Sequence, residues 1–194
     1  MIKYVSTGYT PRAHQSRSHK ALKRFNVLVW HRRAGKTHFA ANEHIDRALQ
    51  NPLYNPQYAY IAPTYGQAKR VVWDIFKQYL RDIPGVEFNE AELRADIKRP
   101  DKRDRIRIVL LGAENPDAIR GMYLDGVILD EYASMNPELW STVVMPALTD
   151  RGGYAIFIST PKGMNHFYRL YMAALQNESW YVNVLKASES GVLS

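Results

Sequence analysis

The sequence predicts an α/β fold, with a mostly parallel central sheet and helices on both of its faces. Strand-like and helix-like segments alternate along the chain, and this order is typical of parallel sheets. Three of the strand-like segments end in polar residues, and ligands bind at the carboxyl ends of strands in such sheets. The chain has 194 residues, 46% of them hydrophobic, which is enough for one domain with one core.

Runs of apolar, β-branched and aromatic residues mark the expected strands. We expect strands at residues 25–30, 57–62, 105–111, 126–131, 154–159 and 180–185. A further strand-like run, over residues 92–97, is separated from the run at 105–110 by Pro100-Asp101, which is typical of a turn. These two runs predict a β-hairpin.

Four stretches between the strands have helical patterns. Residues 36–50 form a helix-like stretch that ends before a proline, and residues 67–81 repeat apolar side chains with a helical period. A typical N-cap followed by proline predicts a helix over residues 136–145. Residues 167–175 carry another apolar helical face. The regular alternation of these helices with the strands is the basis of the predicted fold class.

The first strand-like run leads directly into Gly35-Lys36-Thr37, which opens the helix at 36–50. This is the context of a phosphate-binding loop, in which backbone N–H groups and a helix N-terminus surround phosphate oxygens. Lys36 would reach the β- and γ-phosphates, and Thr37 would ligate Mg²⁺. The usual pattern has another glycine five residues before Gly35, where this chain has Trp30.

The strand at 126–131 ends in two adjacent carboxylates. In NTPases with such a loop, an acidic residue at a strand end holds the Mg²⁺, and Asp130 is placed for that role. Glu131 would take a proton from, or orient, the water that attacks the γ-phosphate. The pair favours hydrolysis over transfer to an acceptor, and a P-loop NTPase of the ASCE/RecA-like type is expected. A solvated acidic turn is the alternative reading of this strand end.

The strand at 154–159 ends in Ser159-Thr160-Pro161. Hydroxyl groups at this edge of the sheet would lie between the γ-phosphate and a neighbouring surface. The alternative is that Ser159 and Thr160 cap a helix or form a turn.

Together, these motifs resemble the ATPase domain of the large terminase subunit of tailed bacteriophages. The segment at 31–37 is similar to the arginine-rich phosphate loop of that family, which often lacks the first glycine. The segment at 9–15 is similar to its glutamine-containing adenine motif, and the segment at 112–121 to a stretch that precedes its Asp-Glu strand. Ser159-Thr160 corresponds to its coupling motif. The resemblance covers roughly residues 4 to 186.

The resemblance implies a domain organisation and a set of partners. Residues 1–186 would be the ATPase domain, and residues 187–194 would begin a linker to a nuclease domain. The implied function is an ATP-hydrolysing motor that translocates double-stranded DNA into a procapsid in the host cytoplasm. The subunits would form a ring, a pentamer on the portal, with the small terminase subunit as a further partner. The motor would not be a stable part of the mature virion.

The resemblance also implies residue roles, with ATP and Mg²⁺ as cofactors. Gln15 would read the adenine edge, although an ordinary exposed glutamine is the alternative. Arg32 or Arg33 would reach the γ-phosphate or form a salt bridge to a neighbouring acid. Arg120 is the candidate for an arginine finger in the next subunit's site, and its alternative is a structural ion pair. The nucleotide contacts are expected from Gln15, Arg32, Arg33, Ala34, Gly35, Lys36, Thr37 and His38.

The chain is basic, with 26 Lys and Arg against 19 Asp and Glu, which gives a net charge of +7. Positive charges concentrate over residues 12–24 and over residues 98–107, the latter at the tip of the predicted hairpin. Such clusters can follow a polyphosphate backbone, and a solvated basic face is the alternative. The candidate DNA contacts are Lys98, Arg99, Lys102, Arg103 and Arg105.

Other classes of protein and site are disfavoured. The chain has no cysteine, so it has no disulfide framework and no cysteine-based zinc site. It has no apolar run near the roughly 20 residues that span a bilayer, and residues 1–4 begin no signal peptide. We expect no membrane partner. The six histidines show no metal-ligand spacing and are interpreted as capping or surface residues: His14, His19, His31, His38, His44 and His166.

Two other functions stay open from the residues alone. A superfamily 2-like helicase or translocase domain has similar motifs, but the chain lacks a second RecA domain. The sequence after Glu131 also lacks the final acidic or histidine position of that class. A non-catalytic DNA-binding scaffold is the other alternative, because Trp30 stands where the loop usually has a glycine.

Overall fold

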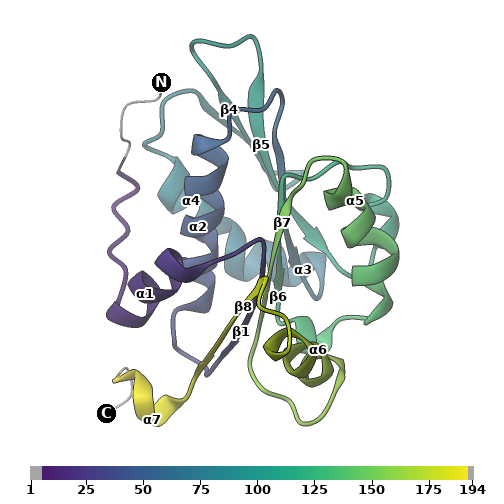
Figure 1. Ribbon diagram of the computed structural model, residues 1–194. Coiled ribbons are helices and arrows are strands. Elements are labelled where there is room, and N and C mark those ends of the chain that lie inside the picture. Colours follow the sequence, from purple (N-terminus) through teal and green to yellow (C-terminus); the bar gives the residue numbers. More distant parts are fainter. Residues whose placement is uncertain (1–5, 192–194) are drawn as a thin grey trace.

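Residues 6–191 are described by the computed structural model, and they form an eight-stranded sheet with helices on both faces (Figure 1). The strand order is β3-β4-β5-β2-β6-β7-β1-β8. Strands β5, β2, β6, β7, β1 and β8 pair in parallel, whereas β3 and β4 pair antiparallel at one edge. The strands are β1 (Phe25–Trp30), β2 (Gln57–Ala62), β3 (Val86–Asn89), β4 (Arg94–Lys98), β5 (Arg105–Gly112), β6 (Gly126–Asp130), β7 (Tyr154–Ser159) and β8 (Trp180–Leu185).

The predicted fold class, the six predicted strands and the predicted hairpin are confirmed. Strand β4 pairs with β5 in the register Lys98↔Arg105, on either side of the expected turn. Strand β3 was not predicted. This strand is only four residues long and partly exposed, so it has no continuous apolar run that would mark it.

Two hydrophobic cores lie on the two faces of the sheet, because successive strand residues point to opposite sides. In β1, Leu28 belongs to the core under α2 (Lys36–Gln50) and α4 (Trp73–Leu80). Its neighbour Val27 belongs to the core under α5 (Met145–Thr149) and α6 (His166–Leu175). Figure 1 shows α2 and α4 on one side of the sheet and α5 and α6 on the other.

The predicted helices are present, but two of them contain wider turns. The helix at 36–50 is confirmed as α2. The region at 67–81 holds the end of α3 (Tyr65–Gln67), a π-helical segment η1 (Ala68–Val72) and then α4. Asn136 caps the next region by accepting a hydrogen bond from the Glu138 N–H at 2.9 Å, and the π-helical η4 (Trp140–Val144) leads into α5. Hydrophobic periodicity located the first of these two helices and the cap signal located the second, but neither pattern could distinguish their π-helical turns.

Two helices fall where none was predicted. Helix α1 (Ala13–Ala21) lies in the basic segment at 12–24, and its buried residues are polar, so it has no apolar stripe. Helix α7 (Ala187–Ser190) falls within the segment expected to begin a linker, of which residues 192–194 lie outside the described part. Short 3₁₀ segments, η2 (Pro116–Ala118) and η3 (Tyr132–Ser134), flank β6. Within residues 6–191, no helix has the length and apolar character needed to cross a membrane.

Candidate active site

The three motif-bearing strands are neighbours in the sheet, in the order β6-β7-β1. Asp130 is level with Ile158 of β7, and Ser159 is level with Val29 of β1. Because the three strands run in parallel, their carboxyl ends meet at one edge of the sheet. The loop after β1, the two carboxylates after β6 and the hydroxyls after β7 therefore come together, as the sequence predicts.

The loop between β1 and α2 has the backbone shape of an anion-binding site. Arg33 and Gly35 both have left-handed conformations, with φ of 67° and 79°. Alternation of this kind turns successive N–H groups toward one point, and the N-terminus of α2 adds its positive end. A side chain at Gly35 would place its Cβ 2.7 Å from Nε2 of Gln15 and displace that amide, and the left-handed φ itself favours glycine.

Trp30 replaces the usual glycine without entering the loop. It is the last residue of β1, its side chain is fully buried, and its indole N–H donates to Oδ1 of Asn183 in β8 at 2.6 Å. The indole packs against Phe39 of α2, with ring centroids 5.0 Å apart. The large side chain therefore joins the core beneath the loop, and its presence does not make the loop degenerate.

Lys36 is buried at the start of α2 and points back over the loop. Its Nζ donates to the carbonyls of Trp30 and His31 at 3.3 and 3.2 Å and lies 3.9 Å from Oε1 of Glu131. Burial lowers the pKa of Lys36, and the nearby carboxylates of Glu131 and Asp130 oppose that shift. A buried cation beside a loop of convergent N–H groups is suited to bind a polyphosphate.

Asp130 is buried, and its carboxylate accepts a hydrogen bond from Tyr60, a residue to which the sequence assigned no role. The Tyr60 hydroxyl donates to Oδ2 of Asp130 at 2.7 Å across the β2–β6 pair. Burial raises the pKa of Asp130 to about 6, whereas the Tyr60 hydrogen bond and Lys36 act in the opposite direction. The two tyrosines of this strand, Tyr58 and Tyr60, were the available signal, since a buried tyrosine hydroxyl usually has a partner.

The donor set suits a magnesium ion. The Tyr60 hydroxyl also interacts with the Thr37 side chain, so the Thr37 hydroxyl and the Asp130 carboxylate converge on the same phenol. A hydroxyl and a carboxylate are hard oxygen donors of the kind that Mg²⁺ prefers next to phosphate groups. The residues predicted to hold the metal therefore fit it by position and by chemistry.

Glu131 has a strained backbone conformation, and its carboxylate contacts the hydroxyls of the β7 motif. Its φ of 53° is left-handed, which costs a non-glycine residue about 1–3 kcal/mol and is typical of functional sites. The Ser159 hydroxyl donates to Oε2 at 3.3 Å, and the Thr160 hydroxyl lies 3.1 and 3.2 Å from the two carboxylate oxygens. Ser159 and Thr160 thus bind the Glu131 carboxylate, and the Ser159 hydroxyl also accepts a hydrogen bond from the Ala133 N–H at the start of η3, at 3.3 Å.

A cavity of about 410 Å³ opens beside these carboxylates. Arg32 lines it together with Asp130, Glu131 and Thr160. Neither Arg32 nor Arg33 forms an ion pair within residues 6–191, so the salt-bridge alternative has no support there. Arg32 is therefore the loop arginine that the fold brings to the candidate site. The lining also includes residues from the segment before α4: Pro63, Gln67, Val71 and Val72.

Three other predicted residues have partners of their own. Gln15 is 3% exposed, and its amide bonds to the Arg12 N–H and to the Gly35 carbonyl, so it is not an ordinary exposed glutamine. The His38 ring bonds to the Tyr79 hydroxyl at 2.8 Å, and only its backbone remains beside the loop. Arg120 follows η2 on the surface and pairs with Asp117. Its side chain is 61% exposed, and the role of arginine finger stays a prediction.

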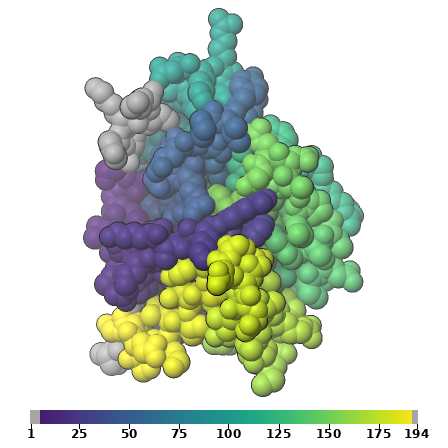
Figure 2. All heavy atoms as spheres, in the orientation of Figure 1, coloured from purple at the N-terminus to yellow at the C-terminus, as the bar shows by residue number. Residues whose placement is uncertain are grey.

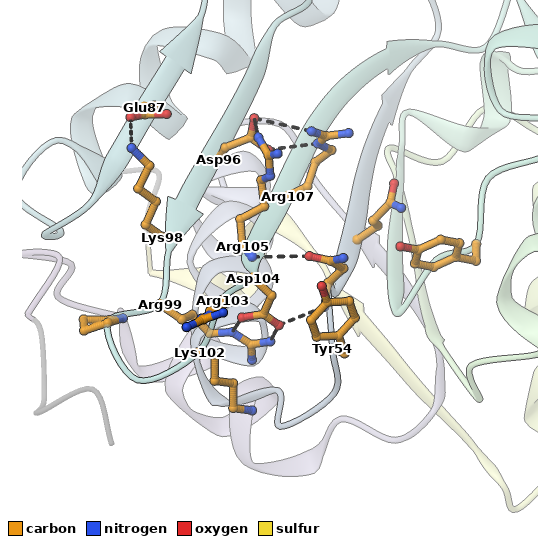
Figure 3. Close-up of a pocket in the computed structure, with 14 residues that line it drawn as sticks. Tyr54, Glu87, Asp96, Lys98, Arg99, Lys102, Arg103, Asp104, Arg105 and Arg107 are labelled. Atoms are coloured by element: carbon orange, nitrogen blue, oxygen red, sulfur yellow. Dashed lines mark hydrogen bonds and ion pairs between the residues drawn. The ribbon is translucent and has the colours of Figure 1, made fainter.

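The basic hairpin lies at the opposite edge of the sheet, where β2 and β5 begin. It lines a cavity of about 730 Å³ together with Tyr54 and Tyr123 (Figure 3). Asp96 in this cavity is surrounded by Arg94, Arg105 and Arg107, at 3.0, 3.7 and 2.9 Å. The cations therefore outnumber the acids that they contact here.

Arg99 does not fit the predicted role of DNA contact. Its side chain is 6% exposed, forms an ion pair with Asp104, and donates to the carbonyls of Asn51 and Leu53 at 2.8 and 2.5 Å. Figure 3 shows this guanidinium facing Asp104, beneath the hairpin tip. The pair fixes the tip to the loop before β2. The other predicted residues, Lys98, Lys102, Arg103 and Arg105, are exposed, although Lys98 pairs with Glu87 and Arg105 lies 3.7 Å from Asp96.

Comparisons with known proteins agree with this geometry. A family model described as terminase large subunit, T4likevirus-type, N-terminal, matches residues 30–190. The large terminase subunit of Thermus phage G20c is 31% identical over 179 residues, which cover 85% of this chain and 36% of that protein. The chain therefore spans 36% of the length of this relative.

Solved structures share the fold. The large terminase ATPase domain of Thermus phage P74-26 has a TM-score of 0.82 and 25% identity, over 95% of this chain and 84% of that one. The large terminase of another thermophilic bacteriophage, solved in complex with ATP-gamma-S, has a TM-score of 0.71 and 22% identity, over 89% of this chain and 42% of that one.

Proposed function

The chain belongs to the terminase large subunit family, and from this we propose that it is an ATP-hydrolysing motor domain that translocates double-stranded viral DNA into a procapsid. The observation that carries the proposal is the meeting of Lys36 and Glu131 at the carboxyl edge of the sheet, 3.9 Å apart. One group is suited to bind the γ-phosphate, and the other to activate the attacking water.

The phosphate loop and Lys36 would bind the triphosphate of ATP. The convergent N–H groups of the loop and the start of α2 favour phosphate oxygens, and Lys36 adds a buried positive charge. Thr37 and Asp130 would hold Mg²⁺, which supplies charge neutralisation on the β- and γ-phosphates when bound. The Tyr60 hydroxyl orients the Asp130 carboxylate for this task.

Glu131 would accept the proton of the attacking water. A carboxylate can do this only if it is held toward the γ-phosphate with a free lone pair. Ser159 and Thr160 donate hydrogen bonds to the carboxylate and fix its orientation. The same contacts make these two residues the proposed coupling elements. A movement of Glu131 during the reaction would displace the segment after β7 through these hydrogen bonds.

Two arginines are proposed to stabilise the developing charge on the γ-phosphate. Arg32 lines the cavity beside Glu131 and would act within its own subunit. Arg120 is exposed on the segment before β6 and would act in the site of a neighbouring subunit. The second role requires a ring, which we propose to be a pentamer seated on the portal, with the small terminase subunit as a further partner in the host cytoplasm.

The exposed cations of the hairpin are the proposed contact to the DNA backbone. Lys98, Lys102, Arg103 and Arg105 line the same cavity, and Figure 3 shows Lys102 and Arg103 near the hairpin tip. Phosphate contacts of this kind give affinity without reading sequence, which suits a motor that moves along any DNA.

ATP hydrolysis in the presence and absence of duplex DNA tests the proposal. The wild-type protein should release phosphate from Mg-ATP, and DNA should change the rate. Lys36→Ala should abolish the release and weaken nucleotide binding. If the wild-type protein binds Mg-ATP and duplex DNA but shows no turnover when assembled on a portal, it is a DNA-binding scaffold and the proposal is wrong.

A further inference from the structure

The first turn of α1 bonds to three consecutive carbonyl groups of the phosphate loop. Nη1 of Arg12 donates to the carbonyl of Arg33 at 3.1 Å, and Nε2 of His14 lies 2.9 Å from the carbonyl of Ala34. Nε2 of Gln15 donates to the carbonyl of Gly35 at 3.0 Å. Three side chains from one helical turn thus donate hydrogen bonds, in chain order, to the carbonyls of three successive loop residues.

We propose that Arg12, His14 and Gln15 are positioning residues for the phosphate loop, and that they set its affinity for the triphosphate group whatever base is attached. This inference rests on the proposed nucleotide site and names a part of it that the loop motif does not include. None of the three side chains needs to touch the nucleotide, since each acts through a carbonyl on the side of the loop that faces α1.

The orientation of these carbonyls decides whether the loop can bind an anion. A peptide group that turns its N–H toward a phosphate turns its C=O away, and a reversed peptide would present a negative oxygen to the phosphate. Arg33 is in a left-handed conformation, which a residue other than glycine keeps only where its surroundings fix it, whereas Gly35 adopts its left-handed conformation without strain. The three donors from α1 provide that fixation at the residues concerned.

The orientation of the Gln15 amide is itself fixed. Its Oε1 accepts a hydrogen bond from the Arg12 N–H at 2.7 Å, while Nε2 donates to Gly35. A reversed amide would place two donors together and two acceptors together, so only one orientation satisfies both partners. One lone pair of Oε1 and one hydrogen of Nε2 are thereby used to hold the loop, and neither of these two bonds requires contact with a base.

Helix α1 is anchored on its other side, so it can act as a fixed support. The His14 ring packs edge-on against the buried indole of Trp30, with centroids 5.3 Å apart. The Ser18 hydroxyl bonds to the Tyr181 hydroxyl of β8 at 3.2 Å. Figure 2 shows the purple N-terminal residues directly against the yellow C-terminal residues on one face of the molecule. The indole in place of the usual glycine is therefore part of the support for His14.

The test compares three ligands that share a polyphosphate but differ in the base: Mg-ATP, Mg-GTP and inorganic tripolyphosphate with Mg²⁺. Gln15→Ala and His14→Ala should each weaken binding of all three by a similar factor, about 3- to 10-fold for one lost hydrogen bond. The KM for ATP should rise by the same factor, whereas kcat should change less. His14→Gln retains a donor and should recover part of the affinity.

Ser16→Ala is the matched control. Ser16 lies in the same turn of α1, and its hydroxyl forms no hydrogen bond in the described part of the chain, so all three affinities should stay unchanged. Thermal unfolding of each variant separates loss of loop positioning from loss of the fold, because a positioning variant loses affinity at temperatures where it remains folded.

The pattern across ligands decides between the possible roles. If Gln15→Ala weakens ATP alone and leaves tripolyphosphate unchanged, Gln15 reads the base and the inference is wrong. If none of the variants changes any affinity, α1 does not position the loop. If the wild-type protein binds none of the three ligands and Lys36→Ala makes no difference, the proposed nucleotide site itself fails, and the inference fails with it.

Discussion

The hydroxyl of Thr160 lies 3.1 and 3.2 Å from the two carboxylate oxygens of Glu131. This contact joins the residue proposed to activate water to the first residue after β7, on a neighbouring strand end. It gives the Ser-Thr motif a direct physical role, because the orientation of the proposed base depends on it. It also means that a change at Thr160 should affect the chemical step rather than nucleotide binding.

Thr160→Val should therefore lower kcat while leaving the affinity for ATP nearly unchanged. Valine keeps the shape of threonine and removes the hydrogen bond to a charged group, which corresponds to a loss of about 10- to 100-fold in rate. Single-turnover hydrolysis and equilibrium nucleotide binding would be measured on the same preparation. Thr160→Ser retains the hydroxyl and should stay close to wild type. An equal loss of affinity and rate in Thr160→Val would contradict this role.

Tyr60→Phe should weaken the response to Mg²⁺. The change removes the donor that orients the Asp130 carboxylate, and loss of such an outer partner usually costs about 10- to 100-fold in metal affinity. The Mg²⁺ concentration for half-maximal ATPase activity would be measured. Tyr58→Phe is the control on the same strand, since its hydroxyl bonds to Asn51 and the Arg47 carbonyl and not to the site. A similar Mg²⁺ response in both variants would refute the role of Tyr60.

The sequence predicted the parts of this site that are contiguous in the chain. The loop at 31–37 and the Asp130-Glu131 pair each follow an apolar run, so local patterns were sufficient to place them on strands and at one edge. The contact between Tyr60 and Asp130 joins residues 70 positions apart. It depends on β2 pairing with β6, which no local pattern reveals.

Helix α1 and Arg99 show why the rest was not predictable. The buried residues of α1 are polar because they bond to the loop and to β8, so the helix lacks the apolar stripe that marks most helices. Arg99 has the composition of a surface cation, but the fold places the Asp104 carboxylate and two carbonyls around it. In both cases, the sequence context indicated exposed residues, but long-range hydrogen bonds hold these residues in buried positions.

DNA binding should depend on the exposed tip of the hairpin. Replacing Lys102 and Arg103 by alanine should reduce the slope of log affinity against log salt by about 2, since each lost phosphate contact lowers it by about 0.9. The control is the double variant Lys69→Ala and Arg70→Ala, which removes the same charge from η1. Its slope should equal that of wild type if the DNA contacts are confined to the hairpin tip. Titration of labelled duplex DNA at several salt concentrations measures both.

Arg99→Ala should behave differently from the tip variants. It leaves the buried Asp104 carboxylate without its partner, so the midpoint of chemical denaturation should fall. The salt slope of whatever folded protein remains should be unchanged. If the double variant of Lys102 and Arg103 has the same salt slope as wild type, the hairpin tip does not contact the DNA. The segment at 12–24 is then the next candidate for the DNA-binding surface.

Arg120→Ala should abolish turnover in an assembled ring and spare nucleotide binding, because a finger acts on the transition state of a neighbouring site. Such an arginine contributes about 10³- to 10⁵-fold in rate. The informative measurement is mixing: Arg120→Ala supplies an intact Lys36 site, and Lys36→Ala supplies an intact Arg120. Mixed rings on a portal should regain ATPase activity that neither variant has alone. No recovery at any ratio would leave Arg32, acting within its own subunit, as the remaining candidate.

Glu131→Gln tests the central claim, that this edge of the sheet hydrolyses ATP with Glu131 as the base. Glutamine keeps the size of the side chain and its capacity to bond to Ser159 and Thr160, but it cannot accept the proton of the attacking water. Single-turnover hydrolysis of Mg-ATP, measured beside equilibrium ATP binding, separates these effects. The account predicts ATP affinity within a few-fold of wild type and a rate lower by about 10²- to 10⁴-fold. Hydrolysis by Glu131→Gln within a few-fold of the wild-type rate would contradict it.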